Sequence, residues 1–133
     1  MIFYKSDFTV TLFVCILITA CDKGKSQTPP AEQPIAFTHN AGNNVFNPGA
    51  FLNFTVTLTS AMPASGILVE VSTKEEVSGN AVGTNSSINS SSAAVNVAVS
   101  SLPRQVCCVI TVKVSSVNNS SNNATQTFRV VYK

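Results

Sequence analysis

The chain has 133 residues, with eight Lys or Arg, six Asp or Glu and a single His, and its net charge is only +2. This balance argues against a nucleic-acid partner, which would call for a clustered basic face. The sequence is poor in charge and rich in Ser, Asn, Thr and Val, a composition typical of β-rich secreted proteins rather than of cytoplasmic enzymes.

An uncharged apolar run from Phe8 to Ala20 lies near the start of the chain, with Lys5 as the nearby basic residue. Its 13 residues fit the apolar region of a signal peptide and fall short of the ~20 residues that span a bilayer. We therefore expect a secretory signal peptide over residues 1–20. The alternative is an ordinary buried N-terminal strand over residues 8–14.

The residues Ile18-Thr19-Ala20-Cys21 at the end of this run resemble the lipobox of bacterial lipoproteins. The resemblance implies that the Cys21 sulfur receives a diacylglyceryl group and that a signal peptidase cuts between Ala20 and Cys21. The mature protein would then begin at Cys21 with acyl chains such as palmitate. Each buried CH₂ contributes ~0.8 kcal/mol, so two or three chains hold a protein firmly at a membrane.

The lipoprotein resemblance also implies a location in the bacterial cell envelope. In some bacteria an Asp directly after the lipidated Cys marks retention at the inner membrane, and Asp22 stands at that position. The rule differs between bacterial phyla, so the sequence leaves inner membrane, outer membrane and cell surface open.

Residues 21–33 are polar, contain Pro and show no apolar period, which predicts a flexible tether. The rest of the chain suffices for one compact domain and not for two, and we place that domain over residues 34–133.

Alternation of apolar and polar residues dominates from Pro34 onward and predicts β-strands. The expected strands cover residues 35–38 at a sheet edge, 52–58, 69–72, 95–100, 106–117 and 125–132. Their inward faces are predicted to carry Phe54, Val56, Val97, Cys108, Ile110, Val112 and Val130.

Turn-forming clusters of Asn, Gly, Pro and Ser separate these strands at residues 40–49, 62–66 and 116–123. The polar segment 77–92 is expected to hold one or two short edge strands or to be mostly loop. About seven short strands without a helical period predict an all-β fold, namely a two-sheet antiparallel sandwich.

The closing part of the chain resembles the last third of fibronectin type III and related immunoglobulin-like modules. The resemblance rests on Leu102-Pro103, a spacer, a long Val/Ile strand, an Asn/Ser-rich turn and a final Phe-x-Val strand. The resemblance implies that the predicted sandwich is immunoglobulin-like. Two family marks are absent: there is no Trp, and neither Tyr4 nor Tyr132 is placed to form a tyrosine corner. The subfamily therefore stays open.

Two cysteines, Cys107 and Cys108, remain once the signal peptide and the acylated residue are set aside. Neighbours in a strand point to opposite faces, so Cys108 is expected in the core and Cys107 outside. A strained disulfide between the two is the alternative. A metal site is less expected, because the two thiols do not converge and His39 is far away in sequence.

Enzymatic interpretations find little support in this sequence. His39 is the only side chain that titrates near neutral pH as a base, and Glu70, Glu75 and Glu76 are better explained as a strand face and a charged turn. We expect no catalytic residues, no metal and no cofactor.

We therefore expect a lipid-anchored envelope protein that acts as a non-catalytic binding or structural module. Its expected partners are the membrane, through acyl chains on Cys21, and a protein. A glycan is less expected because the chain has no Trp and two Tyr. The alternatives are an accessory subunit of an envelope complex for adhesion or polysaccharide handling, and an inhibitor of a hydrolase.

Overall fold

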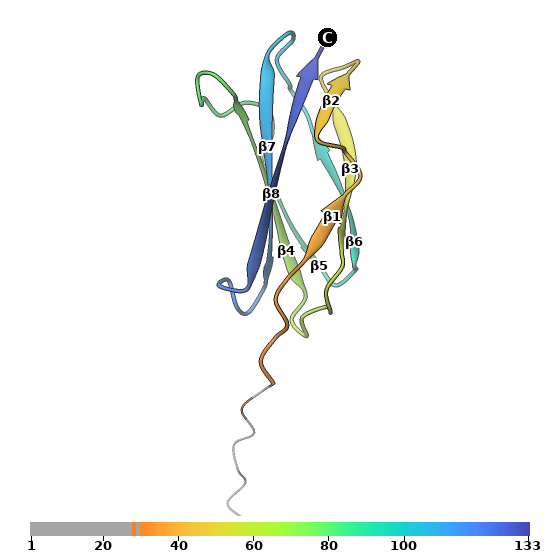
Figure 1. The fold of residues 1–133 in the computed structure, drawn as a ribbon, viewed down its shortest axis with the longest axis vertical. Helices are drawn as coiled ribbons and strands as arrows, with labels where there is room; N and C mark the ends of the chain where they lie inside the picture. The colour runs from red at the N-terminus through yellow and green to blue at the C-terminus, as the bar shows by residue number, and fades with distance from the viewer. Residues whose placement is uncertain (1–27, 29) are drawn as a thin grey trace, which may run out of the picture. The chain divides into compact units, whose positions relative to one another are not determined.

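Two sheets pack face to face in the computed structural model, which describes residue 28 and residues 30–133 (Figure 1). One sheet has three strands in the order β1-β3-β6, and the other has five in the order β2-β8-β7-β4-β5. The strands are β1 (Phe37–His39), β2 (Asn44–Asn47), β3 (Leu52–Leu58), β4 (Ile67–Glu75), β5 (Ser86–Ser90), β6 (Ala94–Val99), β7 (Cys107–Ser116) and β8 (Asn123–Tyr132). The predicted all-β, two-sheet β-sandwich is confirmed, with eight strands where about seven were expected.

One strand pair departs from the predicted antiparallel pattern. The chain leaves β1 at the edge of the three-stranded sheet, turns through Gly42 at a φ of 74°, and joins the five-stranded sheet as β2. There β2 runs parallel to β8, with Val45 opposite Val130. The sequence prediction of a loop over residues 40–49 was wrong for residues 44–47, which form β2. Four residues are too few to show the alternation that predicts a strand.

The core lies between the sheets and consists of the inward positions of each strand. Every residue predicted to face inward is buried, and Ile110, Val112 and Val114 on β7 have no exposed surface. The fully buried residues have Val, Ile, Thr and Cys side chains, and burial of a Val or Ile side chain contributes ~1.5–3 kcal/mol. The alternation in the sequence therefore predicted correctly which face of each of these strands is buried.

The two sheets are also joined by specific contacts near β1. The Phe54 and Phe128 rings meet edge to face, with centroids 5.3 Å apart. The Gln126 Nε2 group of β8 donates to the Phe37 carbonyl oxygen of β1 at 2.6 Å. These contacts hold a three-residue edge strand against the opposite sheet.

The domain begins slightly before the predicted boundary at Pro34. The Glu32 carboxylate accepts hydrogen bonds from Ser116 Oγ at 2.9 Å and Asn122 Nδ2 at 3.2 Å. Asn122 also donates to the Gln33 carbonyl and accepts from the Ile35 amide. The folded unit accordingly runs from Ala31 to Lys133.

Candidate functional site

The end of the sandwich that carries the C-terminus lies opposite the end where Ala31 enters the domain (Figure 1). The β2–β3 loop, the β4–β5 loop and the β6–β7 loop lie toward this end, together with the last residues of β8. We call this surface the distal end.

Two large aromatic side chains are exposed at the distal end. Phe46 on β2 is 68% exposed and Phe51 in the β2–β3 loop is 69% exposed. Asn47 is buried between them, and its Nδ2 group donates to the carbonyl oxygens of Gly49 and Phe51. The turn that presents both rings is therefore held by a buried amide side chain.

The neighbouring β6–β7 loop is tied to the same region by main-chain hydrogen bonds. The Leu102 amide donates to the Ala50 carbonyl at 3.1 Å, and the Gln105 amide donates to the Tyr132 carbonyl at 2.6 Å. Among the described residues, Ser101 and Gln105 are the non-glycine positions with positive φ, both at 60°. Such backbone costs energy and persists only where the surrounding structure holds it in place.

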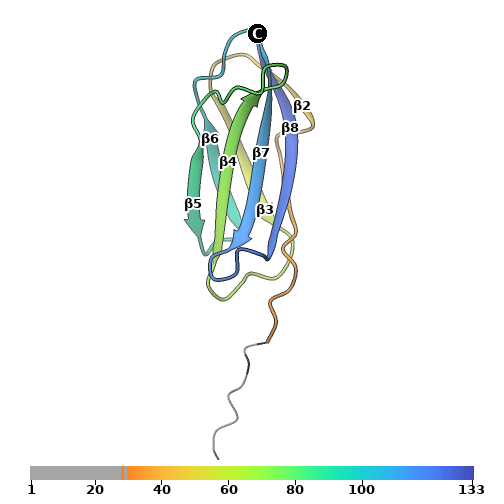
Figure 2. The same cartoon turned by 90° about the vertical axis from the view of Figure 1, so that its left-hand side faces the viewer.

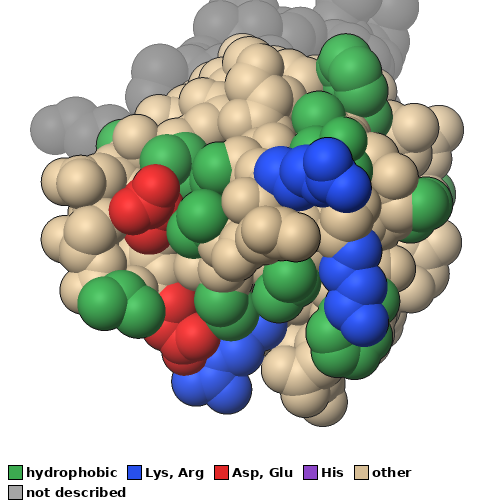
Figure 3. Space-filling view, turned by 90° about the horizontal axis from the view of Figure 1, so that it is seen from above, with side chains coloured by type: hydrophobic (Ala, Val, Ile, Leu, Met, Phe, Trp, Pro, Cys, Tyr) green, Lys and Arg blue, Asp and Glu red, His purple; other side chains and the backbone are tan. Residues whose placement is uncertain are grey.

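Most described charges also lie at or near this end, in Lys74, Glu75, Glu76, Arg104, Arg129 and Lys133. Lys133 Nζ lies 4.2 Å from the centroid of the Phe46 ring, in a cation–π contact. Viewed from above, the acidic side chains lie on one side of the end with a basic group against one of them, and other Lys and Arg side chains lie beside apolar groups (Figure 3). Within the described chain, Arg104 and Lys133 form no ion pair.

Cys107 lies beside Glu76 and Arg129 on the outer face of the five-stranded sheet. Arg129 Nε forms an ion pair with Glu76 Oε1. A hydrogen bond with the Cys107 thiol, and then the one with Arg129, lowers the pKa of Glu76. The same hydrogen bond to Glu76 raises the pKa of Cys107, so the thiol is held protonated and its nucleophilicity is reduced.

Cys108 occupies the core as the alternation predicted. It is buried, and burial raises the pKa of its thiol. Both cysteines are free, so the structure holds neither a vicinal disulfide nor an interruption of β7.

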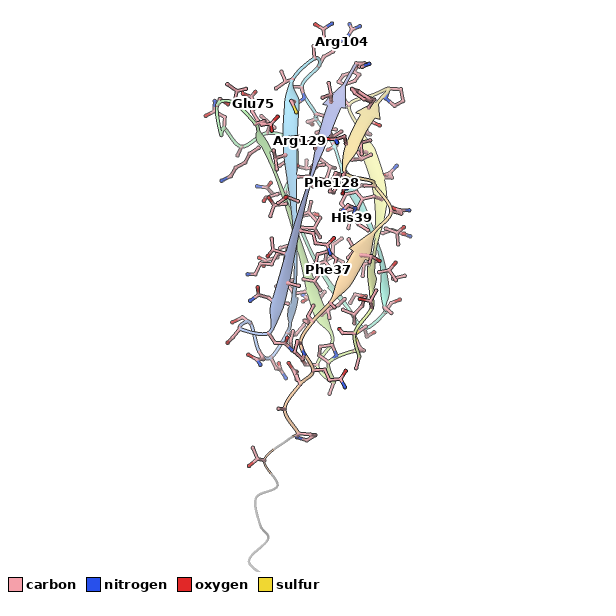
Figure 4. All side chains as sticks on the ribbon, viewed as in Figure 1. Phe37, His39, Glu75, Arg104, Phe128 and Arg129 are labelled. Atoms are coloured by element: carbon pink, nitrogen blue, oxygen red, sulfur yellow. The ribbon has the colours of Figure 1, made fainter. Side chains whose placement is uncertain are left out.

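His39 lies between the sheets, next to the aromatic pair of the core (Figure 4). Its ring is 4.7 Å from that of Phe128, and its Nδ1 atom is buried without a hydrogen-bond partner. Among the described residues, no group bonds this nitrogen to orient the imidazole as in a Ser-His-Asp arrangement. The contacts of His39 are those of a packing residue.

The glutamates named from the sequence do not converge. Glu70 pairs with Lys113 at 3.3 Å on the sheet surface, while Glu75 accepts from Ser78 Oγ in the β4–β5 turn. Across residues 28 and 30–133, no three His, Cys, Asp or Glu side chains gather as metal ligands would.

Ala20 and Cys21, the predicted cleavage and lipidation residues, lie outside the described residues, as does Asp22. No helix in the described part has the length and apolar character needed to cross a membrane.

Sequence reasoning missed Phe46, Phe51 and Arg104. A usable signal was present, because the two Phe residues flank Asn47-Pro48-Gly49, a turn in which large apolar side chains have no core to enter.

Comparisons with known proteins give no family for this chain. No protein-family model matches the sequence, and a search of curated proteins found no significant match.

Proposed function

We propose that this protein is a lipid-anchored, non-catalytic binding module of the bacterial cell envelope, and that its distal end contacts a protein partner. The observation that carries the proposal is the pair of exposed rings, Phe46 and Phe51, at the end opposite Ala31. Protein interfaces are enriched in aromatic and Arg side chains, which fill pockets on the partner.

The anchor part of the proposal rests on Ile18-Thr19-Ala20-Cys21 alone. An anchor joined through residues before Ala31 would attach at the end of the domain that lacks the two exposed rings. The chemistry of the distal end suits a protein surface with an apolar pocket next to acidic groups, because Lys133 lies over the Phe46 ring and Arg104 lies in the neighbouring β6–β7 loop.

The anchor is tested by mass spectrometry of the chain extracted from membranes. The expected product begins at Cys21 and carries added acyl mass, whereas Cys21→Ser leaves an unmodified precursor. A mature chain with another N-terminus, or an unmodified Cys21, would refute the lipoprotein assignment.

The contact surface is tested by site-specific photo-crosslinking in intact membranes. A photoreactive side chain at Phe51 should give one defined protein adduct, which Phe46→Ala weakens. The same probe at Thr57, exposed on β3 away from the distal end, is the matched control. Equal adducts from both positions would contradict the assignment of the distal end.

A further inference from the structure

Two free sheet edges lie along one side of the sandwich. β6 ends the strand order of the three-stranded sheet and β5 ends that of the five-stranded sheet, and they follow the same side of the domain (Figure 2). Residues 84–102, which contain both strands, include no charged residue, no Pro and no Gly. Natural proteins often protect exposed sheet edges with charged side chains or Pro, and residues 84–102 contain neither.

The opposite edges differ. β1 has three residues and follows Pro34, and β2 has four residues and precedes Pro48. Short strands next to Pro offer little backbone for pairing. The edges at β5 and β6 are therefore less protected against pairing than those at β1 and β2.

The register of β6 identifies its free backbone groups. The Leu58 amide donates to the Ala93 carbonyl, and Phe54 lies opposite Val97. Odd-numbered residues of β6 therefore bond to β3, and antiparallel alternation directs the N–H and C=O groups of Ala94, Asn96 and Ala98 toward the free edge. Of these, the Ala94 amide makes a long 3.4 Å contact with Ser92 Oγ.

The sequence of this edge is symmetric. Ala94-Val95-Asn96-Val97-Ala98 reads the same in both directions. An antiparallel pairing centred on Asn96 would place Asn96 opposite Asn96 of a second copy, and Ala94 opposite Ala98. These three residues are the ones whose backbone groups point outward, and all three are exposed.

We propose that a second copy of this chain pairs with the β6 edge, antiparallel, about a two-fold axis through Asn96. Three hydrogen-bonded residue pairs would supply about six main-chain hydrogen bonds and join the two three-stranded sheets into one. The interface is isologous, so the association closes at two copies. No charged side chain lies on the joined strands, so the pairing brings no like charges together.

The proposed pairing uses β6 alone and does not cover the distal end. The two-fold axis reverses the strand direction, so Ala31 lies at opposite ends of the two copies. Phe46 and Phe51 likewise remain at the outer ends, because they belong to β2 and its loop rather than to β6.

Sedimentation equilibrium of the full chain in detergent, over a concentration series, tests the pairing. The expected result is a reversible monomer–dimer equilibrium. Ala98→Lys places a charge on the edge and should weaken dimerisation about tenfold or more. Thr38→Lys adds the same charge to exposed β1 of the same sheet and should leave the equilibrium unchanged. A monomer at all concentrations, or equal effects of the two variants, would overturn the proposal.

A cross-link keeps the test independent of the folding of the lysine variant. In a Cys107→Ser background, oxidation of Asn96→Cys should give a disulfide between two copies, mapped to the peptide containing residue 96, because cross-strand Cα separation there is ~5.5 Å. Asn53→Cys, on the neighbouring strand β3, is the control and should not cross-link. Fibres would show that the copies assemble without a closed two-fold axis. An adduct with another protein alone would show that a different protein occupies the β6 edge. Either result would overturn the two-fold pairing.

Discussion

Cys107 and Cys108 are neighbours in sequence, but they meet different surroundings because successive side chains of a strand point to opposite faces. Cys107 has Glu76 and Arg129 beside it, whereas Cys108 is enclosed by the core. The reactivity of each thiol follows from these neighbours and not from its place in the sequence.

Thiol labelling checks this difference at the residue scale. A thiol reagent should modify Cys107 in the native protein and Cys108 only after unfolding. Glu76→Gln removes the carboxylate that raises the pKa of Cys107, so the labelling rate of Cys107 near neutral pH should increase several-fold. Unchanged labelling in this variant would mean that Glu76 does not control the thiol.

His39 makes stability depend on pH. Burial lowers its pKa in the folded state from the ordinary 6.5, so the unfolded chain takes up the proton at a higher pH than the folded chain does. The free energy of unfolding should therefore fall as the pH drops through about 6.5 and stop falling below the folded-state pKa. Above this window the stabilisation is complete.

Urea denaturation at pH 5 and pH 7.5 measures this dependence. His39→Phe keeps a ring against Phe128 but cannot take up a proton, so it should show a smaller pH dependence than the unmodified chain. Glu76 does not interfere, since its pKa is lowered from 4.5 and its contribution is lost only at more acidic pH. An identical slope in both proteins would assign the effect to another group.

At the scale of single elements, β7 shows how alternation fixes a register. It lies between β4 and β8, and its even-numbered residues from Cys108 to Val114 are all buried. Its odd-numbered residues from Cys107 to Lys113 are half-buried and form the outer face. A slip by one residue would exchange these faces, and the core would receive Lys113.

Alanine substitution on β7 tests this register. Ile110→Ala removes a side chain with no exposed surface and should cost about 2 to 5 kcal/mol of unfolding free energy. Thr111→Ala lies on the outer face and should stay within about 0.5 kcal/mol of the unmodified protein. Chemical denaturation of both variants gives the comparison, and similar losses would mean that the register is wrong.

At the scale of the whole molecule, residues 32–35 are held by the end of β7 and the loop between β7 and β8. The Asn122 side chain forms hydrogen bonds with all three of Glu32, Gln33 and Ile35, which lie about ninety positions earlier in the chain. This clamp orients the chain at the point where any preceding tether joins the domain.

Asn122→Ala should release this clamp without unfolding the sandwich. We expect faster amide hydrogen exchange at Ile35, with β3 and β7 unchanged, because the lost hydrogen bonds are local. Asn119→Ala, in the same loop but without a side-chain bond to residues 31–35, is the control. Faster exchange throughout the core would contradict a local role.

The sequence by itself determined six of the eight strands and their inward faces, because alternation with a period of two is a local signal of a half-buried strand. Val97, Cys108 and Val130 could be placed in the core on this basis alone. The lipoprotein expectation at Cys21 was equally local, and it stays a prediction.

Only the tertiary structure decided which segments meet. β2 exists because β8, more than eighty positions later, offers it a parallel partner. Phe46 lies on β2, Phe51 in the β2–β3 loop and Arg104 in the β6–β7 loop, and the packing of the two sheets brings these segments to one end of the domain. The free edges at β5 and β6 likewise depend on strand order, which no local pattern encodes, because pairing is a competition among all strands for hydrogen-bonding partners.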